Sequence, residues 1–316
     1  MWFSGELTRR FGPEYVKLKR TLHDDKLRYE RYIEPVVGDV PVADLTGERA
    51  ALHADAIIEK MFELSPGARP ATRRQILQVY NRILNLSVFP LRLLLRNDLP
   101  KGYMPTVKTD RAFSYLYPDE EARLLGCTKV PIQHRLGFGI LAREGMRRSS
   151  MRDLKWDDVD LERGMLRLDH NKTDDPAVWK MDPGTTEALR RWRKMQAPVV
   201  REAGYIVANP ASGRRFPRTR SADVLRDALK KAGVKRKELF QSTDARMAIR
   251  LHDLRSTFVT ISLALGKTEA WVTDRTGHKS SQMLYRYKRA ARTHAEAELG
   301  PLVSLHEAIP ELAERR

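Results

Sequence analysis

One segment of the sequence, residues 251–287, carries side chains that together could break a phosphodiester bond. It contains a His-x-x-Arg pair, His252 and Arg255, followed by a second histidine, His278, and by Tyr287 nine residues later. Guanidinium groups bind phosphate oxygens with planar geometry, imidazoles move protons, and a phenol can act as a nucleophile. These are the parts needed to attack a phosphodiester without a metal ion.

Taken singly, each of these residues also has an ordinary structural interpretation. With eight histidines and arginine at about one position in eight, roughly one His-x-x-Arg is expected by chance. A glycine before a polar residue is a common helix C-cap, and a helical tyrosine is usually a packing residue. On a helix, however, positions i and i+3 share a face, so His252 and Arg255 could reach one phosphate. The interpretation of His252 and Arg255 as catalytic therefore depends on finding further residues of the same pattern elsewhere in the chain.

Two upstream positions complete a larger pattern. Residues 145–161, GMRRSSMRDLKWDDVDL, place Arg147 directly after Gly-Met, and the sequence HNKTDD places Lys172 in an expected turn between two strands. Together with 251–287, these positions resemble in order and spacing the tyrosine recombinases, the phage-integrase family. The resemblance covers a catalytic domain from about 118 to 290. It implies six catalytic residues: Arg147, Lys172, His252, Arg255, His278 and Tyr287.

Family spacing also decides between neighbouring candidates. The distance from the Gly-His dipeptide selects Tyr287 rather than Tyr285 as the nucleophile, and on a helix these two residues point about 200° apart. In the family the first catalytic arginine directly follows Gly-Leu or Gly-Met, which selects Arg147 rather than Arg148.

The sequence departs from the family pattern at two positions. Ser150 stands three residues after the first arginine, where the family commonly has an acidic residue, so the usual support of the arginine or histidine must come from elsewhere or be weaker. Thr276 stands before the Gly-His dipeptide, where leucine is usual. We expect this second departure to affect packing only.

The resemblance implies a role for each group. Arg147 and Arg255 would bind the phosphate and stabilise the charge of a pentavalent transition state. The phenol, with a pKa near 10, needs help to lose its proton, and His252 is the expected general base. Lys172 would protonate the leaving 5′-oxygen, and His278 would donate a hydrogen bond to the phosphate. The product would be a 3′-phosphotyrosine, so no metal, ATP or other cofactor is expected.

Hydrophobic periodicity predicts a mainly helical first domain. Helices are expected at 14–33, near 48–64 and from Pro70 onward, and Pro90 should kink or split the last of these. A further helix is expected at about 131–145. The stretch VDLERGMLRLDHNKTDDPAVWKM then predicts a small three-stranded antiparallel sheet, because turn-like residues separate three short apolar runs.

The resemblance turns these elements into an expected architecture. It implies a helical core-binding (SAM-like) domain plus an α+β catalytic domain, the DNA breaking-rejoining enzyme fold, closing around duplex DNA as a C-shaped clamp. The expected boundaries are an N-terminal extension at 1–13, a helical core DNA-binding domain at 14–96, a linker at 97–112, the catalytic domain at 113–292 and a C-terminal tail at 293–316. The apolar residues of the tail could pack on a neighbouring subunit, as a subunit-exchange segment, or on their own domain.

The charge of the chain favours a polyanionic partner. Its formal net charge is +17, and residues 214–250 hold twelve Lys or Arg against four Asp or Glu. Double-stranded DNA is the expected partner, bound by a homotetramer on paired sites and by a monomer or dimer otherwise. The candidate phosphate contacts, each of which could equally be a solvated surface residue, are Arg73, Arg74, Lys108, Arg214, Arg215, Arg218 and Arg220.

Composition narrows the remaining classes of protein. No apolar run approaches the roughly 20 residues of a membrane span, and no secretory signal is visible at the N-terminus. The single Cys127 excludes an intramolecular disulfide and fits a reducing compartment, so a cytoplasmic, nucleoid-associated location is expected. Two alternatives stay open: a type IB topoisomerase-like enzyme, which shares this chemistry, and a non-catalytic DNA-binding protein on the same scaffold.

Overall fold

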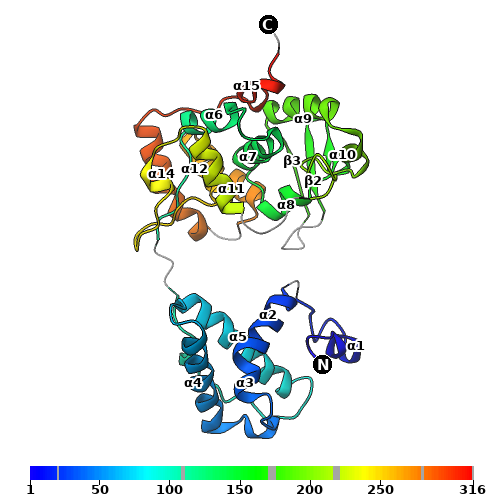
Figure 1. The fold of residues 1–316 in the computed structure, drawn as a ribbon, viewed down its shortest axis with the longest axis vertical. Helices are drawn as coiled ribbons and strands as arrows, with labels where there is room; N and C mark the ends of the chain where they lie inside the picture. The colour runs from blue at the N-terminus through cyan, green and yellow to red at the C-terminus, as the bar shows by residue number, and fades with distance from the viewer. Residues whose placement is uncertain (20, 108–110, 170–175, 216–220, 279–280, 315–316) are drawn as a thin grey trace. The chain divides into compact units, whose positions relative to one another are not determined.

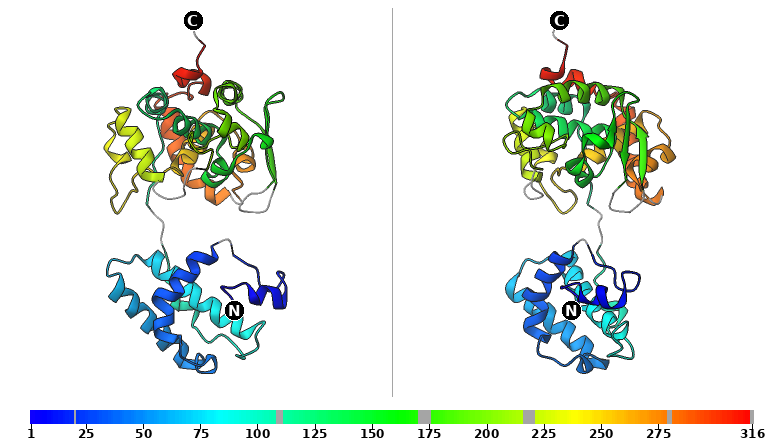
Figure 2. Two further views of the ribbon diagram at one scale, coloured as in Figure 1. Left: turned by 45° about the vertical axis from the view of Figure 1, so that its right-hand side comes forward. Right: turned by 90° about the vertical axis from the view of Figure 1, so that its right-hand side faces the viewer.

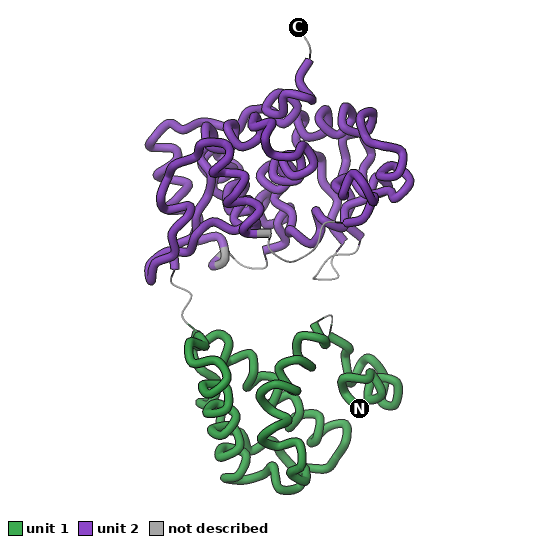
Figure 3. The backbone as a smooth tube through the Cα atoms, in the orientation of Figure 1, with its two compact units in different colours: residues 1–109 green, residues 110–316 purple. Residues whose placement is uncertain are grey.

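The structure is a computed structural model that describes residues 1–19, 21–107, 111–169, 176–215, 221–278 and 281–314. The chain forms two compact units, residues 1–109 and residues 110–316 (Figures 1 and 3). Both units are predominantly helical, and the described strands form one three-stranded antiparallel sheet in the second unit. The predicted fold class, mainly helical with a small antiparallel sheet, is confirmed.

Unit 1 is built around two long helices that each bury one face. On α4, the buried side chains Ala50, Ala54, Ile57 and Met61 are spaced three or four residues apart, as one face of a helix requires. The elements of this unit are α1 (Glu6–Phe11), α2 (Leu22–Arg28), the π-helical turn η1 (Tyr29–Ile33), α3 (Glu34–Val37), η2 (Val42–Asp44), α4 (Gly47–Leu64), α5 (Pro70–Val88) and η3 (Lys101–Tyr103).

Helix α5 begins and ends where the prolines predict. Pro70 occupies its first turn, where a missing N–H costs no hydrogen bond. The helix ends at Val88, two residues before Pro90, because the residue before a proline is disfavoured in the helical conformation. The expected apolar stripe is also present, with Ile76, Val79, Tyr80 and Leu84 all buried.

The helix expected at 14–33 begins later than the sequence suggested. Residues 14–19 contain no helix, and α2 starts only at Leu22. The reason is a tertiary contact: Val16 is fully buried, and its carbonyl accepts a hydrogen bond from Thr8 Oγ1 at 2.8 Å. Packing against the core therefore overrides the helical periodicity of this stretch.

The first thirteen residues, expected as an extension, are packed onto unit 1. They contain α1, and both Trp2 and Leu7 are buried in the same apolar cluster as α4 and α5. Phe3 and Phe11 lie partly buried against that cluster. This segment therefore contributes to the core of the unit.

Unit 2 surrounds a buried central helix with further helices and carries its sheet on one side. The sheet lies at one edge of the unit, beside α9 and α10 (Figures 1 and 2). The elements are α6 (Pro118–Gly126), α7 (Ile132–Glu144), α8 (Arg148–Asp153), η4 (Trp156–Asp158), β1 (Val159–Asp160), β2 (Met165–Leu168), β3 (Ala177–Lys180), α9 (Pro183–Met195), α10 (Pro198–Glu202), α11 (Ser221–Lys231), η5 (Lys237–Leu239), α12 (Asp253–Ala264), α13 (Glu269–Thr276), α14 (Ser281–Glu296), α15 (Leu305–Ala308) and η6 (Pro310–Leu312).

The sheet falls where the sequence predicted it, in the order β1-β2-β3. Leu166, at its centre, is fully buried and lies opposite Val159 on one side and Trp179 on the other. The connection between β2 and β3, which contains Lys172, includes residues 170–175, and these lie outside the described residues.

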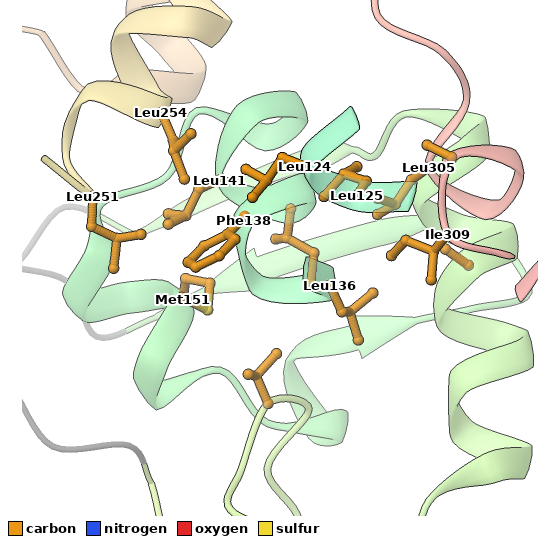
Figure 4. Packing of buried hydrophobic residues seen from close by; sticks show 14 of the residues in the cluster. Leu124, Leu125, Leu136, Phe138, Leu141, Met151, Leu251, Leu254, Leu305 and Ile309 are labelled. Carbon is orange, nitrogen blue, oxygen red and sulfur yellow. The ribbon is translucent and has the colours of Figure 1, made fainter. Parts of the chain in front are cut away.

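Helix α7 forms the centre of unit 2. Every residue from Arg135 to Glu144 is buried, so the helix has no solvent-exposed face along this stretch. Phe138 and Leu141 pack in one cluster with Met151 of α8 and Leu254 of α12 (Figure 4). The end of α7 leads directly into Gly145-Met146-Arg147, so the buried helix fixes the backbone position of Arg147, the first candidate catalytic arginine.

In this single chain the C-terminal segment packs on its own unit, one of the two arrangements that the sequence left open. Leu305, Ile309 and Leu312 are buried in the main cluster of unit 2. Arg135, on α7, donates to both carboxylate oxygens of Glu311 and to the carbonyls of Val130 and Leu125. Further arginines reach the same segment: Arg143 donates to the carbonyl of Val303 and Arg191 to that of Leu312.

Because Arg135 is almost fully buried, removing its partner should destabilise the unit. We expect Glu311→Ala to lower the free energy of unfolding of unit 2 by about 1–3 kcal/mol, since the guanidinium keeps its two carbonyl partners but loses its counter-charge. Urea unfolding followed by tryptophan fluorescence reports on this unit, because four of the five tryptophans lie in it.

The matched control is Glu307→Ala, which removes an exposed carboxylate from the same segment and should change the unfolding free energy by less than about 0.5 kcal/mol. Equal stability of the Glu311→Ala variant and the parent protein would show that the segment is not held by this contact.

Candidate active site

Five of the six expected catalytic residues converge from four separate elements of unit 2. Arg147 is the N-cap of α8, His252 and Arg255 lie at the start of α12, His278 follows the end of α13, and Tyr287 lies on α14. The sixth, Lys172, lies outside the described residues. Arg147, Arg255 and His278 line one cavity, together with the ends of the two strands that flank the Lys172 connection, Leu168 and Ala177.

Two arginines are held side by side by backbone carbonyls. Arg255 is 4% exposed and donates through Nη1 to the carbonyl of Gly145 at 2.7 Å and through Nη2 to the carbonyl of Thr276. Arg147 donates through Nη2 to the carbonyl of Gly277 at 3.4 Å. Carbonyls at the C-terminal end of α13 carry partial negative charge, which offsets the repulsion between the two guanidinium groups. Burial and the charge of Arg147 lower the pKa of Arg255 to about 10, so it is still charged at neutral pH.

Two glycines make this arrangement possible. Gly145 ends α7 with φ 62°, in the left-handed region, and a Cβ on it would lie 2.2 Å from the ring of Phe258. Gly277 ends α13 with φ 60°, and a Cβ on it would lie 3.6 Å from Nη2 of Arg147. Glycine takes up this backbone conformation without a steric penalty. The fold therefore requires glycine at both positions, before Met146-Arg147 and before His278.

Both histidines of the site are held neutral by their surroundings. Burial, followed by the charge of Arg255, lowers the pKa of His252 below its ordinary value. Burial, followed by the charges of Arg255 and Arg147, lowers the pKa of His278 to about 4. A neutral His252 can accept a proton, as a general base must.

The structure separates the two neighbouring tyrosines. Tyr287 is 7% exposed, and its ring lies 4.6 Å from that of Phe113 and 6.2 Å from that of His278, between centroids. Tyr285 is 73% exposed. Of the two tyrosines, Tyr287 is the one whose ring lies near His278, and it remains the candidate nucleophile.

A buried carboxylate, that of Glu144, contacts two residues that line the same cavity as Ser150, Trp179 and Arg275. Ser150 lines the same cavity as the arginines. Glu144, three residues before Arg147, is fully buried and accepts hydrogen bonds from Trp179 Nε1 at 2.9 Å and from the backbone N–H of Asp182 at 3.0 Å. Arg275 approaches it at 3.7 Å. Glu144 thus connects the end of α7 to β3, α9 and α13. Its burial raises the pKa of its carboxyl group.

Sequence reasoning missed four contributors to the site. Arg250 and Asp253 form an ion pair at 3.0 Å that fixes the first turn of α12. Phe113 packs against Tyr287, and Thr276 hydrogen-bonds to His278 Nδ1 at 2.8 Å. The expectation that Thr276 affects packing only is wrong. The sequence already showed threonine at position 276 where leucine is usual, and its hydroxyl group indicated that a hydrogen bond could form there.

The basic candidates for DNA contact are only partly free to bind phosphate. Arg73 lies over the ring of Phe62 at 5.3 Å, and Arg74 donates to the carbonyl of Pro105 at 3.0 Å. Arg215 is paired with Asp153 at 2.9 Å. Arg214 is exposed, whereas Lys108, Arg218 and Arg220 lie outside the described residues.

Within the part of the chain that the structure describes, no cluster of three or more His, Cys, Asp or Glu side chains is arranged to hold a metal ion. None of the described helices combines the length and the apolar character needed to cross a membrane.

A helical fold that brings together the buried Arg255, the partly buried Arg147, two histidines and a buried tyrosine defines the class of enzymes that exchange DNA strands, and comparison with known proteins agrees. The model of the phage integrase family matches residues 114–294, more than half of the chain. The chain therefore belongs to the phage integrase family, the tyrosine-type site-specific recombinases, as the sequence predicted.

Individual relatives are distant in sequence. The chain is 26% identical over 219 residues to a Sinorhizobium fredii protein named "Putative integrase/recombinase y4eF", covering 69% of this chain and 80% of the relative. Among solved structures, a lambda integrase fragment, crystallised as a dimer bound to a COC′ core site, has a TM-score of 0.63 at 16% identity, covering 89% of this chain and 95% of that one. The Tn1549 transposon integrase in complex with circular intermediate DNA has a TM-score of 0.63 at 17% identity, covering 93% and 97%. At these identities the structures support the fold.

Proposed function

We propose that this protein is a site-specific DNA recombinase or integrase that cleaves and rejoins duplex DNA through a 3′-phosphotyrosine intermediate. The observation that carries the proposal is the pair of guanidinium groups, Arg147 and Arg255, fixed on the carbonyls around Gly277 next to a buried tyrosine. Fixed guanidiniums aimed at one anion stabilise the extra charge of a phosphoryl transition state and need little reorganisation when it forms.

The remaining residues supply proton transfers and positioning. Tyr287 attacks the phosphorus through its phenol oxygen, and neutral His252 accepts the phenolic proton. Lys172 donates a proton to the departing 5′-oxygen, so that a 5′-hydroxyl leaves. This role is supported by the described ends of the two flanking strands, Leu168 and Ala177, which line the arginine cavity. His278 binds a phosphate oxygen.

The covalent intermediate keeps the energy of the broken bond. Attack of the free 5′-hydroxyl on the phosphotyrosine restores a phosphodiester and releases the tyrosine, so the cycle requires neither ATP nor a metal ion. The proposed roles use only side chains of this chain.

The proposed partner is double-stranded DNA. Relatives with this fold were crystallised as a dimer on a core site and as a tetramer on a Holliday junction. By analogy we propose that unit 1 is the core DNA-binding domain, that the stretch around 97–112 links it to the catalytic domain, and that the active assembly is a homotetramer on paired sites.

A nicked duplex tests the cleavage step directly, because loss of a short 5′-hydroxyl strand traps the covalent intermediate. A pool of nicked duplexes with randomised sequence is first enriched for binding to the protein, and the enriched pool is then incubated with it in the presence of EDTA and without ATP. We expect SDS-stable protein–DNA adducts and free 5′-hydroxyl ends.

Specific binding without adducts would refute the enzymatic proposal and leave a DNA-binding protein on this scaffold. Relaxation of supercoiled plasmid lacking the enriched sequence would indicate the topoisomerase-like alternative instead.

A further inference from the structure

Thr276 and His278, which both line the arginine cavity, are joined by a hydrogen bond. Thr276 is the last residue of α13 and is 1% exposed. Its Oγ1 lies 2.5 Å from the carbonyl oxygen of Val272 and 2.8 Å from Nδ1 of His278. Its own carbonyl accepts a hydrogen bond from Arg255 Nη2, so both ends of this residue are fixed.

The two contacts of this hydroxyl determine where its proton lies. A hydroxyl has one proton to donate, and the carbonyl of Val272 can only accept. Two oxygens 2.5 Å apart without a proton between them would repel each other, whereas 2.5 Å is within the range of an O–H···O hydrogen bond. The hydroxyl of Thr276 therefore donates to Val272, as threonine often does one helical turn back. Its oxygen is then an acceptor, and Nδ1 of His278 must be the donor.

We propose that Thr276 is a positioning residue that fixes His278 with its proton on Nδ1, so that Nε2 can donate to a DNA phosphate only after the ring has taken up a second proton. The inference deepens the proposed function and rests on it. The proton comes from solvent, is held on Nε2 in a hydrogen bond to a non-bridging phosphate oxygen, and returns to solvent when the DNA leaves.

The charges around His278 favour this uptake only when DNA is bound. In the free protein the neighbouring cations and burial keep the ring neutral, with a pKa of about 4. A phosphate bound between the two arginines would offset their charge and stabilise the imidazolium. The titratable and charged groups that face or line this part of the site among the described residues are Arg147, His252, Arg255, Asp274, Arg275 and Tyr287.

Leucine at this position, which the family resemblance makes usual, could not hold the ring in this way. With an apolar side chain in place of Thr276, Nδ1 has no acceptor there, and the neutral ring is free to carry its proton on Nε2. The neutral histidine could then donate to phosphate directly. Thr276→Val tests this, because it replaces the hydroxyl by a methyl group of similar size. Thr276→Ser keeps the hydroxyl and serves as the matched control.

The first measurement needs no DNA. Nitrogen-15 NMR of protein labelled at histidine distinguishes protonated from unprotonated ring nitrogens, and the signals of His278 are those that disappear in His278→Asn. At neutral pH we expect a protonated Nδ1 and an unprotonated Nε2 in the parent protein and in Thr276→Ser, and a gain of the Nε2-protonated form in Thr276→Val. An Nε2-protonated ring in the parent protein would overturn the proposal.

The second measurement is the single-turnover cleavage rate on the enriched nicked duplex as a function of pH. Titrations shared by the parent protein and a variant cancel in the ratio of their rates. We expect the ratio of Thr276→Val to the parent to rise by about tenfold to a hundredfold from acid to alkaline pH, since only the parent loses its donor as the imidazolium deprotonates. The ratio for Thr276→Ser should stay flat.

The two measurements separate the possible failures. A pH-independent ratio for Thr276→Val would refute the role of Thr276 even if the parent protein cleaves DNA normally. If the parent forms no adduct at any pH, the proposed function fails, and the NMR experiment still decides whether Thr276 fixes the ring of His278.

Discussion

Tyr287→Phe should abolish formation of the covalent protein–DNA adduct and leave DNA binding intact. The substitution removes the phenol oxygen that we assign as nucleophile and keeps the ring, whose packing against Phe113 and 7% exposure show that it belongs to the core of the site. The expected result on the nicked duplex is no adduct above background, with a dissociation constant within about twofold of the parent protein.

Tyr285→Phe is the matched control, since the two tyrosines lie on one helix only two residues apart. Tyr285 is 73% exposed and should tolerate loss of its hydroxyl with cleavage unchanged. If Tyr287→Phe forms adducts as well as the parent while Tyr285→Phe does not, the assignment of the nucleophile is wrong.

Arg255→Lys should lower the single-turnover cleavage rate by about a hundredfold to a thousandfold, the usual effect of removing one preorganised transition-state donor. Lysine keeps the charge but loses the planar set of donors, and it cannot hold the carbonyls of Gly145 and Thr276 while also binding phosphate. The effect should lie in the cleavage rate more than in DNA affinity, because the charge that attracts DNA is preserved.

Arg148→Lys is the control for this experiment, because Arg148 is the neighbour that the Gly-Met-Arg order rejects. We expect it to cleave at close to the parent rate. Urea unfolding of both variants separates a catalytic effect from loss of structure. An Arg255→Lys variant that unfolds like the parent and cleaves at the same rate would show that the phosphate is bound elsewhere.

Much of the fold could be predicted from the sequence because its signals are local. The proline in the first turn of α5, the proline just after its end, the buried stripe on that helix and the three short apolar runs of the sheet are all signals from residues close together in the chain. The exception at 14–19 depends on a contact with the core that periodicity does not encode. The same holds for the C-terminal segment, whose partner Arg135 lies 176 residues from Glu311.

The residue types of the candidate site could be proposed from the sequence, whereas the contacts that hold them could not. Arg255 and Gly145, 110 residues apart, meet only because α7 and α12 pack together. The role of Thr276 depends on a residue only two positions away, His278, yet the sequence does not reveal whether the threonine hydroxyl donates to the ring or accepts from it. Glu144 is similar: its position before the Gly-Met-Arg sequence was visible, but its contacts with β3 and α13 come from the tertiary fold.

The measurement that most directly tests the central claim is identification of the residue linked to DNA. Adducts formed on the enriched nicked duplex are digested with nuclease and protease, and the modified peptide is sequenced by mass spectrometry. We predict a nucleotide attached through its 3′-phosphate to the oxygen of Tyr287, with 5′-hydroxyl ends on the released strand. A nucleotide on Tyr285 or on any other residue, or a 5′-phosphate linkage, would contradict the account.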